Sequence, residues 1–405
     1  MRMDARGAAC SRAFVAAIVA QASCARDGEL ESHAAAPAEA AAAAAPVEVE
    51  TPRPGDPARA APHVAAARAA IAAVDRAGAR RELDLALAAD PACVEALEQL
   101  GWFLLDPAPG QDPGAALLCF LRLRRLGAAG VVVSAGEGVA RAASGDGAGA
   151  RPLLDAAAGS PELQSDPARR AKVEFALGLL DGDDGRAADA IVHVARVLEL
   201  EPVPAFRAEP LVALGELLIG SSKPEEGEMR LREAIAADPE HVKARYVLSR
   251  LLQRLGRADE AQRQMRVHDL LERILSPERR PGPDAAAEQA EMRAQLLAAE
   301  PDCRAFRSGW LRALLEARRY DEASREIAQL ARREPPTAEL AFLLARARAG
   351  LGDLAGAEKS RALMRKLDPK VPATLDRVIL EEWRRGVPAV SDDQIEGVLL
   401  QWSRR

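Results

Sequence analysis

The feature that most constrains the fold of this 405-residue chain is a repeat with a period of 34 residues. Two successive copies of one pattern begin at Ala208 and at Val242. Each copy opens with apolar residues at helical spacing, breaks at a polar or glycine-containing turn, and resumes with a second apolar stripe. The pattern predicts pairs of antiparallel helices, which would bury their apolar residues as a row of local interfaces.

Small residues recur where the two helices of one unit would approach most closely. Gly215 and Ser249 stand at position eight of the repeat, and Gly227 and Ala261 stand at position twenty. A minimal side chain lets two backbones come close, and a larger residue at position twenty-four fills the neighbouring gap. Pro239, at position thirty-two, ends the second helix because proline lacks the amide donor.

Three further stretches keep this register, over residues 173–202, 304–335 and 338–369. With five units in frame, the sequence resembles the tetratricopeptide repeat family. The resemblance implies an all-α fold, a right-handed superhelical solenoid of antiparallel helix pairs. It also implies that the first helix of each repeat lines a concave face, with repeat positions two, five and nine pointing into it.

Residues 1–24 have the order of a secretory signal peptide. Basic residues precede the apolar run 13–20, and small residues then lead to Cys24. Cleavage after Ala22 would release the chain. Cleavage before Cys24 would leave that residue to carry lipid, as in the bacterial lipoprotein signals that this stretch resembles except at Gln21. A disordered cytosolic tail is the alternative.

The remaining chain divides by composition. Residues 25–62 have hardly any large apolar residue, so we expect a disordered linker rich in alanine and proline. We expect the solenoid over residues 63–371 and two C-terminal capping helices over residues 372–405.

Two units of the solenoid are expected to be irregular. Residues 127–161 include five glycines between Gly136 and Gly149, each of which weakens a helix by about 1 kcal/mol relative to alanine. Within residues 276–301, closely spaced prolines predict a loop, and Asp284 would cap the helix that follows. The second terminal helix is predicted to open with a capping box formed by Ser391 and Gln394.

No arrangement typical of catalysis stands out. The five histidines are far apart, the five cysteines form no CxxC pair, and no phosphate-binding loop motif follows a strand. The net charge of −6 argues against a nucleic-acid partner. No apolar run approaches the roughly 20 residues of a membrane span. We therefore predict a non-enzymatic protein with no metal site, no cofactor and a protein or peptide as its partner.

The resemblance also implies where such a partner would bind. The groove positions carry basic and aromatic residues, which suit carboxylate contacts and stacking on an extended, acidic peptide. The predicted partner-binding residues are Phe175, Lys243, Tyr246, Arg250, Arg254, Arg312, Phe342 and Arg346. The family's carboxylate-clamp pattern, lysine at position five and asparagine at position nine, is absent, which argues against a chaperone-tail adaptor. The competing interpretation is that an arginine-rich chain places arginines at these positions by composition alone.

Three functions remain open from the sequence. The first is a scaffold of the cell envelope, exported and either periplasmic or membrane-anchored by lipid on Cys24. The second is a cytosolic regulator or adaptor built on the same repeats. The third is an accessory subunit of a separately encoded enzyme.

Overall fold

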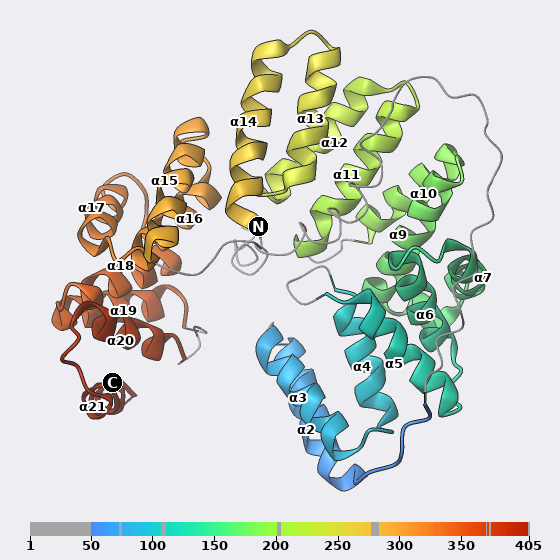
Figure 1. The fold of residues 1–405 in the computed structure, drawn as a ribbon, viewed down its shortest axis with the longest axis horizontal. Helices are drawn as coiled ribbons and strands as arrows, with labels where there is room; N and C mark the ends of the chain where they lie inside the picture. Colours follow the sequence, from blue (N-terminus) through green and yellow to red (C-terminus); the bar gives the residue numbers. More distant parts are fainter. Residues whose placement is uncertain are drawn as a thin grey trace. The chain divides into compact units, whose positions relative to one another are not determined.

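The computed structural model describes residues 50–72, 75–106, 111–200, 204–276, 283–369, 371 and 374–403. Within these ranges every regular element is a helix, which confirms the all-α prediction (Figure 1). The predicted signal peptide, Cys24 and residues 25–49 of the predicted linker lie outside the described residues.

The chain divides after Ala261 into two compact units. The helices of the first unit are α2 (Pro57–Ala72), α3 (Arg76–Ala89), α4 (Val94–Leu104), α5 (Pro113–Arg125), α6 (Val131–Ala143), α7 (Gly147–Ala158), α8 (Pro161–Gln164), α9 (Pro167–Asp183), α10 (Ala187–Glu199), α11 (Pro204–Gly220), α12 (Pro224–Ala237) and α13 (Val242–Arg254). Helix α14 (Ala258–Leu275) begins in the first unit and ends in the second. The second unit continues with α15 (Pro283–Ala299), α16 (Arg304–Glu316), α17 (Tyr320–Leu330), α18 (Ala338–Gly350), α19 (Leu354–Leu367), α20 (Thr374–Gly386) and α21 (Asp392–Ser403).

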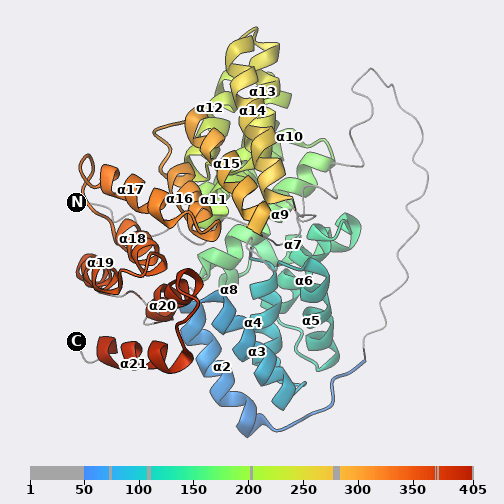
Figure 2. The ribbon, with the colours of Figure 1, turned by 60° about the vertical axis from the view of Figure 1, so that its left-hand side comes forward.

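The five predicted repeats coincide with five helix pairs: α9 with α10, α11 with α12, α13 with α14, α16 with α17, and α18 with α19. Within the first unit, successive helices such as α11 and α12 pack side by side (Figure 2). The small residues of α11 and α12 meet as predicted, because a Cβ atom added at Gly227 would lie 2.9 Å from the carbonyl oxygen of Gly215. The close approach of the two backbones therefore depends on these glycines.

One backbone feature recurs at the turn of every one of these five pairs. The residue at repeat position fifteen has a positive φ, in the left-handed region that favours glycine. The five residues are Gly185, Ser222, Gly256, Arg318 and Gly352, with φ between 58° and 80°. The first helix therefore ends at the same repeat position, thirteen, in each pair, and the second helix can turn back against it.

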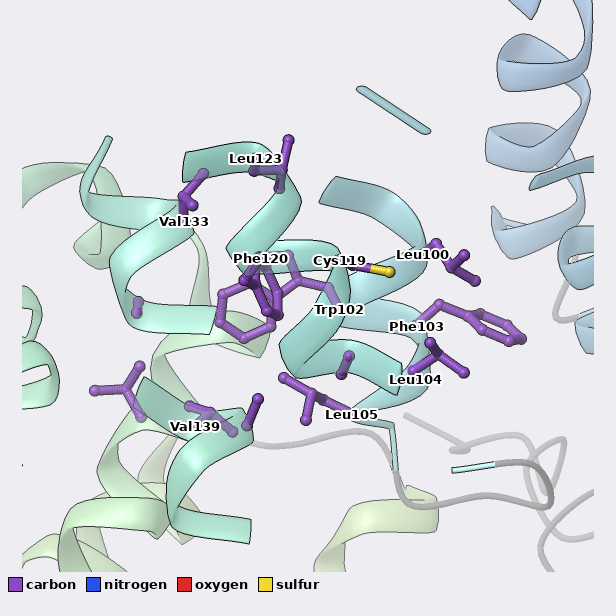
Figure 3. Packing of buried hydrophobic residues seen from close by; sticks show 14 of the residues in the cluster. Leu100, Trp102, Phe103, Leu104, Leu105, Cys119, Phe120, Leu123, Val133 and Val139 are labelled. Atoms are coloured by element: carbon purple, nitrogen blue, oxygen red, sulfur yellow. The ribbon is translucent and has the colours of Figure 1, made fainter. Parts of the chain in front are cut away.

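The glycine-rich stretch 127–161 forms two full helices, α6 and α7, followed by the short α8. Here the glycines serve packing. The ring of Phe120 lies edge-on to Trp102, with 5.7 Å between ring centroids (Figure 3). The same ring presses on two backbones, since a Cβ atom at Gly136 would lie 2.2 Å from Phe120 Cζ, and one at Gly101 would lie 2.8 Å from it. The expected loss of helix propensity is offset by burial of an aromatic ring.

Two expected boundaries differ from the structure. Helix α2 begins at Pro57, inside the predicted linker, because Asp56 Oδ1 accepts hydrogen bonds from the amides of Ala58 (3.0 Å) and Arg59 (3.3 Å). Helix α15 begins at Pro283, so Asp284 is a helical residue and not the expected cap. Proline suits the first helical position because its missing amide has no partner there.

The predicted capping box at the start of α21 is confirmed. The Ser391 amide donates to Gln394 Oε1 (2.9 Å), and the Gln394 amide donates to Ser391 Oγ (3.3 Å). Each side chain therefore satisfies an amide that the helix start would leave without a partner.

The tight packing of Phe120 on Gly136 and the open space around Gly397 predict opposite effects for two glycine-to-alanine changes. Gly136→Ala should lower the free energy of unfolding by about 2 kcal/mol, because the new methyl overlaps a fully buried ring. Gly397→Ala, where no atom lies within 4 Å of the new Cβ, should raise it by up to about 1 kcal/mol. Urea unfolding followed by circular dichroism measures both. A stabilising Gly136→Ala would contradict the proposed packing role.

Candidate protein-binding face

Helix α13 separates a buried side from an exposed side. Its apolar residues, among them Leu248 and Leu252, are buried against neighbouring helices. Tyr246, Arg250 and Arg254 are exposed on the other side, at intervals of four residues. Because an α-helix has 3.6 residues per turn, the three side chains follow one another along one face. We call these three residues the α13 row.

The α13 row carries two positive charges without a counter-ion of their own. Arg250 and Arg254 make no hydrogen bond or ion pair with any other residue in the described part of the chain. The neighbouring Lys243 differs, since its Nζ lies 2.9 Å from Glu216 Oε2 on α11. The row is therefore open to a negatively charged partner, whereas Lys243 is already neutralised.

A buried histidine fixes the start of α13 against α11. His241 Nδ1 accepts a hydrogen bond from the Ala244 amide (3.2 Å), and its Nε2 lies 3.0 Å from Glu209 Oε2. Burial alone would lower the pKa of His241, but the hydrogen bond and the charge of Glu209 outweigh burial and raise it. This contact joins successive first helices and holds the α13 row in place on its face.

The other aromatic residues of the predicted groove belong to the packing of their own units. Phe175 on α9 is half-buried and lies edge-on to Phe206 of α11, with 5.4 Å between ring centroids. Phe342 on α18 packs against the apolar clusters around Leu311 and Ile379. Both phenylalanines are less exposed than Tyr246, of which 39% of the surface is exposed.

The basic residues predicted in the second unit are paired. Arg312 on α16 forms an ion pair with Glu339 on α18. Arg346 is only 8% exposed, and its Nε donates to Glu382 Oε2 (2.8 Å) while its Nη2 donates to Glu316 Oε1 (3.0 Å). The predicted place of Arg346 on an open face is therefore corrected. Glu382 is itself 1% exposed, and Arg346 neutralises a carboxylate that would be costly to bury alone.

A cluster of charged residues that was not predicted from the sequence lies between α9 and α4. The Arg169 guanidinium lies 5.4 Å from the ring of Trp102, and Arg169 also pairs with Glu98 at 2.9 Å. Lys172 Nζ lies 2.7 Å from Asp106 Oδ1. Side chains of α9 thus fill the face of α4. No local sequence pattern indicates this contact, because only the structure shows that α4 and α9 meet.

A charged cavity of about 440 Å³ lies between α7, α9 and α10. Its floor holds Asp181, which accepts hydrogen bonds from Arg151 (2.6 Å) and Arg186 (2.7 Å). Burial acts to raise the pKa of Asp181, but these two arginines lower it overall. His193 Nδ1 lies 2.7 Å from Glu174 Oε2 at the same site. These charges satisfy one another, so the cavity holds an internal ion network.

The described residues also offer no metal site and no membrane span. Among them, no group of three or more His, Cys, Asp or Glu side chains could hold a metal ion. None of the helices in the described ranges is long and apolar enough to cross a membrane.

The different settings of Arg346 and Arg312 predict different costs of removal. Arg346→Ala should lower the free energy of unfolding by about 2 kcal/mol, because it leaves the buried Glu382 with only the longer hydrogen bonds from Tyr320 (3.3 Å) and Arg385 (3.2 Å). Arg312→Ala should cost less than about 1 kcal/mol, because its ion pair is partly exposed. Urea unfolding of the full chain compares the two variants, and equal losses would show that Arg346 has no such structural role.

One stretch of the chain matches a known protein family. Residues 218–271, which run from the end of α11 through α12 and α13 into α14, match the sequence model described as tetratricopeptide repeat. A search of curated protein sequences gave no match.

Several solved structures resemble the chain at low identity. A tetratricopeptide repeat protein from Parabacteroides merdae is 15% identical, with 62% of this chain and 98% of that chain covered and a TM-score of 0.28. The tetratricopeptide repeat domain of P58(IPK) is 16% identical, with 85% and 97% covered and a TM-score of 0.27. PilF of Pseudomonas aeruginosa is 17% identical, with 53% and 96% covered and a TM-score of 0.25. Residues 218–271 therefore contain tetratricopeptide repeats, and the helix pairs on either side continue the same register.

Proposed function

We propose that this chain is a non-enzymatic protein–protein interaction scaffold whose partner binds on the α13 row. Repeat proteins of this kind present extended surfaces on the exposed sides of their helices. The observation that carries the proposal is that Arg250 and Arg254 are exposed and unpaired, whereas the other predicted basic residues, Lys243, Arg312 and Arg346, are already bound by acidic residues.

The pairing of repeat positions supports this choice of site. Position nine of one repeat meets position two of the next in Glu216 with Lys243, and again in Arg312 with Glu339. Arg250 also stands at position nine and is exposed, but no carboxylate in the described part of the chain forms an ion pair with it. Its charge is therefore available to a partner.

The test reverses the charge of the row in the full chain. Arg250→Glu combined with Arg254→Glu should reduce capture of the native partners from an extract of the source cells by about tenfold, because like charges would then oppose an acidic partner. Quantitative mass spectrometry of the captured proteins measures the change.

The matched control is Arg263→Glu combined with Arg266→Glu, two exposed arginines on α14 outside the row. It changes the net charge by the same amount and should leave the captured proteins unchanged. Capture that is equal for both double variants would remove the α13 row as the binding site.

For the location of the scaffold, we propose the cell envelope. The order of basic, apolar and small residues before Cys24 supports export, followed either by release into the periplasm or by anchoring through lipid on Cys24. The alternative is a cytosolic regulator. The two hypotheses differ in the residue at which the mature chain begins.

Intact-mass measurement and N-terminal sequencing of the protein from its own cells test the location. We expect a membrane-bound chain that begins at a lipid-modified Cys24, or a released chain that begins at Ser23 after cleavage behind Ala22. A chain that begins at Met1 in the soluble fraction would overturn the export proposal and favour the cytosolic regulator. It would leave the proposal for the α13 row untouched.

A further inference from the structure

The α13 row has a spacing that an extended peptide can match. Tyr246, Arg250 and Arg254 follow at intervals of four residues. A helix rises about 1.5 Å per residue, so neighbouring members of the row stand about 6 Å apart along the axis. In an extended chain, every second side chain lies on the same face, at intervals of about 6.6 Å. Over three residues, the spacing of the row and the spacing of an extended chain differ by only about 1 Å, which a flexible arginine side chain can span.

The chemistry of the row specifies what should stand at those intervals. Each guanidinium offers five N–H donors in a planar fork, which carboxylates can accept in pairs. Arg250 and Arg254 have no such acceptor within the described part of the protein. The exposed part of Tyr246, 39% of the residue's surface, can contact an apolar or aromatic side chain.

The surroundings of the row favour an extended peptide over a docked helix. An amphipathic helix binds through its apolar side and needs an apolar groove to receive it. The neighbouring α11 exposes none of its large apolar side chains in the described range, and directly after the row a single large apolar residue, Leu255, is exposed. A peptide held by side-chain charge and one ring contact does not need such a groove.

We infer that the α13 row selects an extended acidic segment that has two carboxylates two residues apart and an apolar or aromatic residue two positions from one of them. The inference rests on the proposed function, because it assumes that the row is where partners bind. It adds which partner sequence the row takes. The occupant is an acidic stretch of another protein.

Three short peptides separate spacing from charge, each labelled with a fluorophore and titrated with the full chain. The first, Phe-Ser-Glu-Ser-Glu-Ser-Phe, places both carboxylates on one face of an extended chain. The second, Phe-Ser-Ser-Glu-Glu-Ser-Phe, has the same composition but points them to opposite faces. The third replaces both glutamates of the first by glutamine. Fluorescence anisotropy at low salt measures the three dissociation constants.

We expect the first peptide to bind about tenfold more tightly than the glutamine peptide and at least about threefold more tightly than the second. Arg250→Glu combined with Arg254→Glu should abolish this preference, while Arg263→Glu combined with Arg266→Glu should keep it. Equal binding of the first two peptides, or no binding of any peptide, would overturn the inference. If the native partners still depended on Arg250 and Arg254, the proposed function would stand without it, and a folded acidic partner would take the place of the peptide.

Discussion

The structure depends on a backbone constraint at repeat position fifteen. In each of the five regular pairs, one residue in the left-handed region ends the first helix and lets the second fold back on it. Glycine meets this constraint without strain in three repeats, but Ser222 and Arg318 adopt the same conformation at a cost of about 1–2 kcal/mol. Packing of the two helices must outweigh that cost, which indicates that burial between helices, and not the turn residue, decides where each pair closes.

Buried carboxylates paired with arginine form a second recurring element. Glu137 is bound by arginines of α5 and α6, and Glu382 by Arg346. In the terminal helices, Arg361 donates to both oxygens of Asp376 at 2.8 Å. Each ion pair joins two helices, and separating these helices would leave a buried carboxylate without its arginine. Some arginines of this chain thus serve to pair with buried carboxylates, and an arginine at a groove position is informative only where no carboxylate reaches it.

The sequence predicted the helix pairs because their signal is local. Apolar spacing, small residues such as Gly215 and Gly227, and the capping box at Ser391 each act within one repeat, so they could be recognised without a structure. The positive φ at position fifteen was not predicted, since Ser222 and Arg318 conceal it. The state of the groove residues was not predictable either. Whether Arg346 is open or buried depends on Glu382, 36 residues away on another helix, and no local pattern reports that contact.

Regularity of the repeat limits how much charge stays available on its surface. Position nine of one repeat meets position two of the next, and opposite charges there neutralise each other, as in Glu216 with Lys243 and in Arg312 with Glu339. Arg250 also stands at position nine, but none of the described carboxylates forms an ion pair with it. The proposal for the α13 row therefore rests on a charge that the repeat does not neutralise, and the same comparison of positions nine and two can be made in any repeat sequence of this kind.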